Sequence, residues 1–307
     1  MSSKKSILNI FLVTNPMVAI VAYEYIHEQS FKDDEVQIIF THGFSSKLFS
    51  DMKVKSSYRG IFEKIGDRFS IRFLSYSAVT RRLVESQKNP FIVYSAWLDG
   101  ISSEIIKSNL CEGHIYMEEG DLTYKNFPLF SSSPSYKSIP RHKIGFHEAT
   151  DYWRDDGLLW IGISEKSFPP VPDDKKYKIK SFENVKKKYS PFLMEYKNIL
   201  LMPTPARLPK NEWKNAIVKL AESSNQPFAL KLHPAFSYSP SVIKYFTKSL
   251  VDLGFSESIV CNKETIIELE MMLDKKNLVG DRSSLSRYAE VFGSTFTEVP
   301  FLYGSFY

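Results

Sequence analysis

Short apolar runs alternate with stretches of helical periodicity along this chain, and this alternation restricts the possible folds more than any other feature. In the N-terminal half, Pro16 begins a helix, and strands are predicted at residues 7–13, 35–41, 72–74, 91–94 and 113–117. These strands are apolar almost throughout, which is typical of a parallel sheet that carries helices on both faces. Residues 1–165 are therefore predicted to form a Rossmann-like α/β domain.

The alternation returns in the C-terminal part of the chain. Strands are predicted at residues 198–202, 228–232, 258–260 and 277–280, and helices at 212–223, 240–253, 265–273 and 285–292. Residues 196–307 are therefore predicted to form a second Rossmann-like domain, whose last helix is able to pack back on the N-terminal domain. Ligands of such sheets bind beyond the carboxyl ends of the strands, so we expect a ligand cleft between the two domains.

A change of composition separates the two halves. Residues 166–195 contain a cluster of prolines followed by many lysines, among them Lys186-Lys187-Lys188. Proline clusters and charge runs of this kind predict an inter-domain linker. We expect the lysines to be solvated, with a peripheral contact to an anionic inner membrane or a glycan as the alternative.

The composition limits the class of protein. The chain of 307 residues has a formal net charge of +5, which favours acidic partners such as nucleotide sugars but falls short of a nucleic-acid-binding protein. Its two cysteines, Cys111 and Cys261, form no disulfide framework, which favours a reducing cytoplasmic setting. The first apolar run is interrupted by Asn9 and followed by Pro16, so we interpret it as a strand rather than a signal peptide.

An acidic pair follows the strand predicted at residues 113–117. Glu118-Glu119-Gly120 places two carboxylates at a strand end, and the glycine suits a tight turn after them. Adjacent carboxylates repel each other, which raises the pKa of one of them and makes it a usable general base. A solvated pair of loop acids would give the same triplet.

A histidine follows the strand predicted at residues 228–232. In Lys231-Leu232-His233-Pro234, the proline ends the strand and restricts the backbone after the histidine. A histidine at this position can donate a hydrogen bond to a phosphate oxygen and give up its proton as the ester leaves. A structural histidine before a turn is the alternative.

A serine pair precedes the last predicted helix. Ser283-Ser284 can bind a phosphate through its hydroxyls and through the free N–H groups of the helix N-terminus, unless one serine serves only as a helix cap. Three acidic residues precede this pair and could accept hydrogen bonds from a ribose, namely Glu264, Glu268 and Glu270. Glu268 and Glu270 lie about 200° apart on a helix, so at most one of them faces a ligand.

This ordered set of motifs resembles the bacterial GT-B sialyltransferases, that is, the lipo-oligosaccharide sialyltransferases, the capsular polysialyltransferases and their relatives. The family carries a [D/E]-[D/E]-G motif, an H-P motif and a serine pair, which here match Glu118-Glu119-Gly120, His233-Pro234 and Ser283-Ser284. Two further similarities are residues 11–16 and 160–169. The resemblance implies a GT-B fold, in which two Rossmann-like domains turn parallel sheets towards a central cleft.

The resemblance also implies roles for these residues. Glu118 or Glu119 is the base that activates the acceptor, and His233 assists departure of CMP. The donor CMP-sialic acid is bound by Ser283 and Ser284 at its phosphate, by Glu270 as first choice at its ribose, and by Lys231 and Pro234.

The resemblance therefore implies an inverting sialyltransferase that modifies an oligosaccharide or glycolipid of the bacterial surface and requires no cofactor. No D-x-D pair is present to hold a donor through a metal ion, so we expect no metal. Two alternatives remain, an enzyme that uses CMP-Kdo or another CMP-nonulosonic acid, and a non-catalytic glycan- or nucleotide-binding protein.

Overall fold

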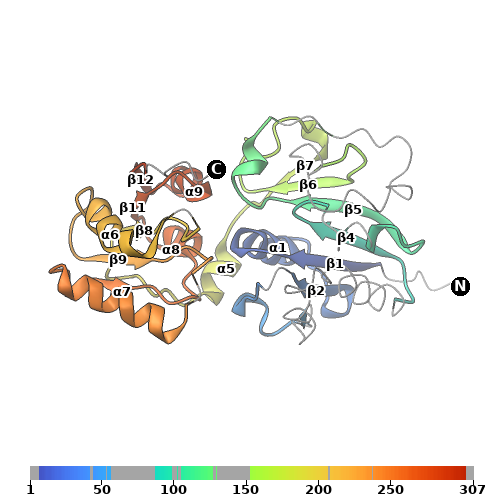
Figure 1. Ribbon diagram of the computed structural model, residues 1–307. Helices are drawn as coiled ribbons and strands as arrows, with labels where there is room; N and C mark the ends of the chain where they lie inside the picture. Colours follow the sequence, from blue (N-terminus) through green and yellow to red (C-terminus); the bar gives the residue numbers. More distant parts are fainter. Residues whose placement is uncertain are drawn as a thin grey trace, which may run out of the picture. The chain divides into compact units, whose positions relative to one another are not determined.

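The computed structural model consists of two compact units, residues Met1–Val185 and Lys186–Tyr307 (Figure 1). The structure describes residues 7–41, 44–52, 54–56, 87–98, 102, 105–126, 129, 153–206, 208–236 and 238–301. The strand predicted at residues 72–74 lies outside the described residues. Each unit contains one parallel sheet with helices, which confirms the predicted α/β fold.

The first unit contains a seven-stranded sheet in the order β3-β2-β1-β4-β5-β6-β7, and all neighbouring strands are parallel. Its strands are β1 Leu8–Val13, β2 Val36–Phe40, β3 Val54–Ser56, β4 Phe91–Ser95, β5 Cys111–Met117, β6 Leu159–Gly162 and β7 Lys176–Lys178. The predictions for β1, β2, β4 and β5 are confirmed. The order of the strands reverses between β1 and β4, and such a reversal marks the usual ligand position in a doubly wound sheet.

Helix α1, Pro16–Glu28, follows β1 and is buried from Met17 to Ile26. Asn15 caps it, because its Oδ1 accepts a hydrogen bond of 3.0 Å from the N–H of Val18. Pro16 occupies the first turn, where the missing N–H costs no hydrogen bond. A helix that is apolar on nearly every side belongs in a core, and α1 contacts both β1 and β5.

Part of the predicted linker belongs to the first unit instead. Residues 176–178 form β7 beside β6. Two glutamates of α1 hold the chain beyond it: Glu28 accepts from the N–H of Lys180 (2.7 Å), and Glu24 accepts from the N–H of Val185 (2.7 Å). The composition could not reveal this, since the partners of these exposed lysine-rich residues lie about 150 residues earlier. The chain passes from one unit to the other within α5, Glu183–Lys188.

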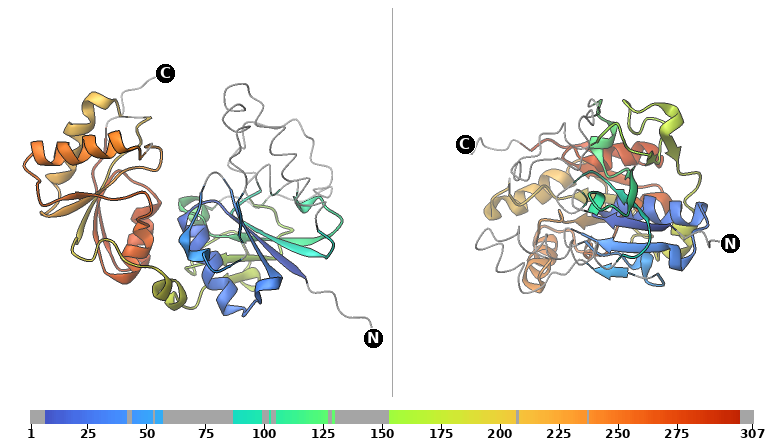
Figure 2. Two further views of the ribbon diagram at one scale, coloured as in Figure 1. Left: turned by 90° about the horizontal axis from the view of Figure 1, so that it is seen from below. Right: turned by 90° about the vertical axis from the view of Figure 1, so that its right-hand side faces the viewer.

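The second unit contains a five-stranded sheet in the order β10-β9-β8-β11-β12, again entirely parallel. Its strands are β8 Asn198–Leu201, β9 Phe228–Lys231, β10 Ile259–Val260, β11 Asn277–Gly280 and β12 Thr295–Glu298. Its helices are α6 Trp213–Ala221, α7 Pro240–Asp252, α8 Ile267–Leu273 and α9 Ser284–Val291. All of these were predicted except β12. Helices α6 and α7 cover one face of the sheet and α8 and α9 the other (Figure 2).

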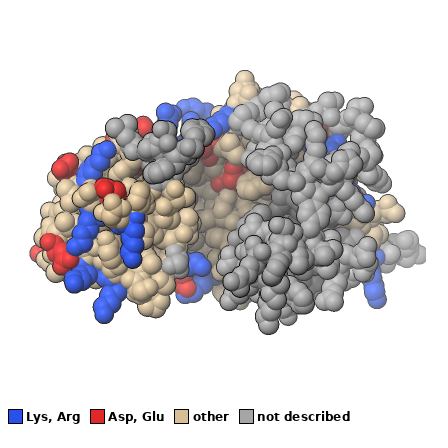
Figure 3. Space-filling view, viewed as in Figure 1, with Lys and Arg blue, Asp and Glu red and all other residues tan. Residues whose placement is uncertain are grey.

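The strand order of this sheet reverses between β8 and β11, where the two strands approach closely. A Cβ atom on Gly280 would lie 2.7 Å from the Cβ of Leu201, so no larger residue fits there without displacement. On the face drawn in Figure 3, basic side chains of the second unit are interspersed with acidic ones rather than gathered into one stripe. None of the described helices is both long enough and apolar enough to cross a bilayer.

Candidate active site

The carboxyl edge of the first sheet holds the acidic pair, and the two glutamates differ in their surroundings. Glu118 is fully buried. Its carboxylate accepts hydrogen bonds from the hydroxyl of Tyr124 (2.6 Å), the N–H of Ile163 (2.9 Å) and the hydroxyl of Ser167 (2.7 Å). A Cβ atom on Gly162 would lie 2.5 Å from the Cβ of Ser167 and 3.2 Å from this carboxylate. Glu118 therefore fastens the end of β5 to the loop after β6.

Residues 163–168 form this loop, and its last residue has an unusual backbone. Phe168 has a φ of 53° in the left-handed region, where a bulky side chain is strained. Its ring is buried and lies edge-on to Trp153, and its N–H donates to the carbonyl of Thr123 (2.8 Å). The packing of Phe168 thus holds a strained loop against the segment that follows the acidic pair.

Glu119 is partly exposed, in contrast to Glu118. Burial, the charge of Glu118 and the charge of Asp121 together raise the pKa of Glu119 to about 7. The side-chain amide of Asn15 lies 3.2 Å from its carbonyl oxygen and 3.4 Å from its Oε2. A carboxylate with this pKa can take up a proton near neutral pH. Of the two predicted candidates for the base, the geometry favours Glu119.

The same edge carries hydroxyl groups that the sequence analysis did not single out. Thr14, Thr41 and Ser95 follow or end β1, β2 and β4, and their buried hydroxyl oxygens have no hydrogen-bond partner among the residues that the structure describes. A buried hydroxyl without a partner costs about 1–3 kcal/mol, so water or a ligand is the usual occupant of such a site. Thr14 and Ser95 flank the reversal between β1 and β4. A serine or threonine directly after a buried strand is the only sequence signal that could have found them.

The carboxyl edge of the second sheet holds the histidine. His233 follows β9 and is exposed. Its Nδ1 accepts a hydrogen bond of 3.1 Å from the N–H of Ala235, so the proton of the neutral ring resides on Nε2. Desolvation of the ring lowers the pKa of His233. Pro234 begins the turn that the N–H of Phe236 closes on the carbonyl of His233. The histidine is thus a neutral hydrogen-bond donor at Nε2.

Lys231 is engaged with the loop between β10 and α8. Its Nζ donates to the carbonyls of Thr265 (2.7 Å) and Asn262 (3.2 Å) and lies 5.4 Å from the ring centre of Tyr238. Desolvation lowers the pKa of Lys231. This ammonium group was predicted to assist at the nucleotide, whereas the structure places it on two backbone carbonyls. Lys231 supports the segment that leads into α8.

The three glutamates before the serine pair differ in burial, and Glu264 is exposed. Glu270, the expected ribose ligand, is buried. Its carboxylate accepts from the hydroxyl of Tyr189 (2.7 Å) and from the N–H groups of Phe192 (2.8 Å) and Leu193 (3.0 Å). These bonds occupy it with residues 189–193 of its own unit. Glu268 lies in the first turn of α8 and is partly exposed, with its pKa raised by desolvation in spite of the nearby Lys231.

The serine pair lies where α9 begins. Ser283 is the N-cap residue by position, but its side chain makes no capping hydrogen bond. Within the described part of the chain, the hydroxyls of Ser283 and Ser284 have no hydrogen-bond partner, whereas Ser286 donates to the carbonyl of Ser283 (2.7 Å). The alternative, in which a serine serves only as a helix cap, does not match this geometry. Both hydroxyls are available to a ligand.

His233 and the serine pair lie at one edge of one sheet. β9 and β11 are both neighbours of β8, and adjacent strands lie about 4.8 Å apart, so their ends are separated by roughly 10 Å. The serines also flank the reversal between β8 and β11, where ligands of doubly wound sheets bind. One nucleotide can span this distance.

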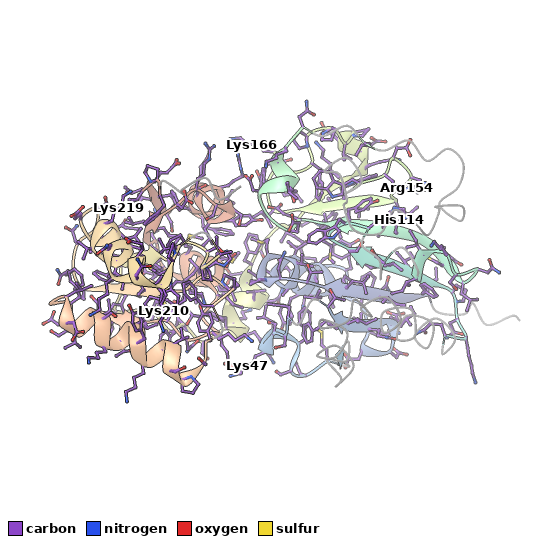
Figure 4. The ribbon with its side chains drawn as sticks, viewed as in Figure 1. Lys47, His114, Arg154, Lys166, Lys210 and Lys219 are labelled. Carbon is purple, nitrogen blue, oxygen red and sulfur yellow. The ribbon has the colours of Figure 1, made fainter. Side chains whose placement is uncertain are left out.

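A second histidine shows what a structural role looks like in this protein. His114 of β5 is fully buried, with Nε2 3.1 Å from the hydroxyl of Tyr116 and 3.6 Å from Asp156. Arg154 lies beside it (Figure 4) and forms an ion pair of 3.3 Å with Asp156. Burial lowers the pKa of His114 to about 4.

Among the described residues, no group of three or more His, Cys, Asp or Glu side chains is placed to hold a metal ion.

Comparison with known proteins yields distant structural similarities. No protein-family model and no curated protein sequence matches the chain. The fold is similar to that of a UDP-GlcNAc 2-epimerase from Methanocaldococcus jannaschii, with a TM-score of 0.48 and 10% identity over 94% of this chain and 82% of that one. It is also similar to Anabaena Alr3699/HepE in complex with UDP and glucose (TM-score 0.45, 11% identity, 94% and 80% covered) and to the glycosyltransferase SnogD from Streptomyces nogalater (0.43, 10%, 95% and 81%).

Proposed function

We propose that this protein is a metal-independent glycosyltransferase that moves sialic acid, with inversion, from CMP-sialic acid to a hydroxyl of a bacterial surface glycan. The observation that carries the proposal is the division of labour within the acidic pair. Glu118 is held by three hydrogen bonds, whereas Glu119 is partly exposed and its pKa is raised to about 7. In a solvated pair of loop acids, neither carboxylate would be buried and neither pKa would be strongly raised.

In the proposed reaction, Glu119 accepts the proton of the acceptor hydroxyl. The acceptor oxygen attacks the anomeric carbon of the sialic acid from the side opposite the phosphate, so the configuration inverts. The bond between the anomeric carbon and the phosphate oxygen breaks, and its electron pair remains on CMP. Because the base must be ionised, turnover is expected to fall as the pH drops below about 7.

His233 and the serine pair stabilise the departing phosphate. The ring of His233 is neutral with its proton on Nε2, so it donates a hydrogen bond to a phosphate oxygen as negative charge develops there. Ser283 and Ser284 add their hydroxyl donors, together with the free N–H groups at the start of α9. The donor side therefore contributes hydrogen bonds, and the proton released in the reaction goes to Glu119.

The ribose of CMP is assigned to Glu268 rather than Glu270. The carboxylate of Glu270 is already occupied by three donors from residues 189–193, whereas Glu268 is partly exposed in the first turn of α8. The choice of CMP and of sialic acid rests on the family resemblance of the three motifs. CMP-Kdo or another CMP-nonulosonic acid fits the same donor groups and is the second candidate.

The test is to incubate the purified protein with CMP-sialic acid, CMP-Kdo and UDP-N-acetylglucosamine, each with and without acceptor oligosaccharides, and to measure nucleotide release. We expect CMP release from CMP-sialic acid that increases with acceptor and is lost in Glu119→Gln. Release from CMP-Kdo alone would replace the donor. If no sugar nucleotide is consumed but CMP binds, the protein is a binding protein and the proposal fails.

A further inference from the structure

Asn15 connects the start of α1 with Glu119. Its side chain makes two kinds of contact at once. Oδ1 accepts the hydrogen bond of 3.0 Å from the N–H of Val18 that caps the helix, while Nδ2 lies 3.2 Å from the carbonyl oxygen of Glu119 and 3.4 Å from its Oε2. These residues are 104 positions apart, and β4 separates the strands that precede them.

We propose that Asn15 is the positioning residue of Glu119, whose amide holds this carboxylate in place and supports its ionised form, an inference that rests on the proposed role of Glu119 as base. Asn15 touches no reacting atom in this scheme. It acts through Glu119 by donating from Nδ2, and the helix cap that it makes with Oδ1 fixes the direction of that donor.

The chemistry of the position explains why asparagine is present. Serine, threonine and aspartate cap helices as well as asparagine does, but none of them carries an amide donor beside the capping oxygen. A residue that only capped α1 could be any of the four. The two contacts to Glu119 are the additional property that asparagine alone provides.

The charged groups around Glu119 oppose its ionisation, so a hydrogen-bond donor to its carboxylate has a clear effect. Two carboxylates face it, that of Glu118 at the end of β5 and that of Asp121 in the 3₁₀ helix η3, Asp121–Tyr124. Both charges oppose ionisation of Glu119. The opposing influences are the amide of Asn15 and the N-terminus of α1, where the helix dipole favours a negative charge. The hydroxyl of Thr123 accepts from the N–H of Glu119 and is neutral in this balance.

The inference is tested with Asn15→Asp, which keeps the capping oxygen but replaces the amide donor by a third carboxylate. We expect the acidic limb of the kcat–pH profile to move up by about one pH unit, so that kcat at pH 6 falls about tenfold. Above the limb, kcat should return to within about threefold of the original value. Asn15→Ser, which caps without an amide, should move the limb in the same direction by less.

Ser239→Ala is the matched control, because Ser239 caps α7 directly before a proline just as Asn15 caps α1. It should lower the melting temperature without moving the limb. If Asn15→Asp leaves the limb unchanged, or lowers kcat equally at every pH, Asn15 is only a cap and the inference is wrong.

A second measurement separates this inference from the proposed function. Carboxyl ¹³C NMR reports the pKa of Glu119 without any turnover, and Asn15→Asp should raise it. An unchanged pKa overturns the inference whatever the activity. If instead Glu119→Gln retains full turnover while the pKa of Glu119 moves as expected, the base assignment fails and the coupling between Asn15 and Glu119 stands.

Discussion

Substitutions at Glu118 and Glu119 should affect different properties, although the two residues are adjacent. Glu118→Ala removes the acceptor of three hydrogen bonds and leaves the N–H of Ile163 and the O–H of Ser167 buried without an acceptor. Each orphaned buried donor costs about 1–3 kcal/mol, so we expect a loss of about 2–6 kcal/mol in the free energy of unfolding. For a unit of this size, that corresponds to a melting temperature about 5–20 °C lower.

Glu119→Gln should instead lower turnover and leave the fold intact. Loss of a general base typically lowers kcat by about 10²–10⁴. The pKa of Glu119 is raised in the folded state, so the folded protein loses stability as the pH rises from about 4.5 to about 7. Glutamine has no charge to bury. Its stabilising effect should therefore grow across this window and stay constant above it, reaching about 1–2 kcal/mol for a partly exposed group.

The assay combines thermal melts at pH 5 and pH 8 with steady-state kinetics for both variants and for Glu118→Gln, which retains one acceptor oxygen. Compared with the unmodified protein, the melting temperature should be much lower for Glu118→Ala and somewhat lower for Glu118→Gln. For Glu119→Gln it should be higher, and only at pH 8. The reasoning is refuted if Glu119→Gln keeps its turnover while a well-folded Glu118→Gln loses it, because Glu118 would then be the base.

Four further outcomes are expected. Because it removes a hydrogen-bond donor to the negative charge that develops on the phosphate, His233→Ala should lower kcat about 100-fold or more at an unchanged melting temperature, and near-normal turnover would make the histidine structural. The double variant Ser283→Ala/Ser284→Ala should bind CMP about 100-fold more weakly by calorimetry, without the loss of stability that a missing cap would cause. Activity should persist in excess EDTA, and a loss that magnesium or manganese restores would contradict the proposal. Glu268→Gln should weaken CMP binding about tenfold, whereas Glu270→Gln should lower the melting temperature and leave CMP binding unchanged. The reverse result would show that Glu270, not Glu268, binds the ribose.

Most of the strands that the sequence predicted lie inside their sheets, where burial dictates the side chains. The exceptions are β10, an edge strand that was predicted, and β6, an interior strand that was not. β1, β2, β4, β5, β8, β9 and β11 lie inside their sheets or are flanked by helices, so their residues are apolar almost throughout. β7 and β12 are edge strands with the sequences Lys-Tyr-Lys and Thr-Phe-Thr-Glu, and neither was predicted. An edge strand is half exposed to solvent, so its composition does not differ from that of a loop.

The positions of the candidate site were predictable for a related reason. A polar residue directly after a buried strand lies at the carboxyl edge of the sheet, whatever the rest of the chain does. Glu119 and His233 were found in this way, whereas Ser283 was found because it precedes a predicted helix. The same rule would have found Thr14 and Ser95, which carry weaker chemical signals.

The sequence by itself determined the two parallel α/β sheets and the strand ends that carry polar groups, because burial and strand polarity act within a few residues. Only the tertiary structure decided which carboxylate is available to a substrate, both between Glu118 and Glu119 and between Glu268 and Glu270. Glu118 is locked by donors from residues 163 and 167, and Glu270 by donors from residues 189 to 193. The availability of a carboxylate depends on the hydrogen-bond donors around it, and here those donors come from segments that only folding brings to its side.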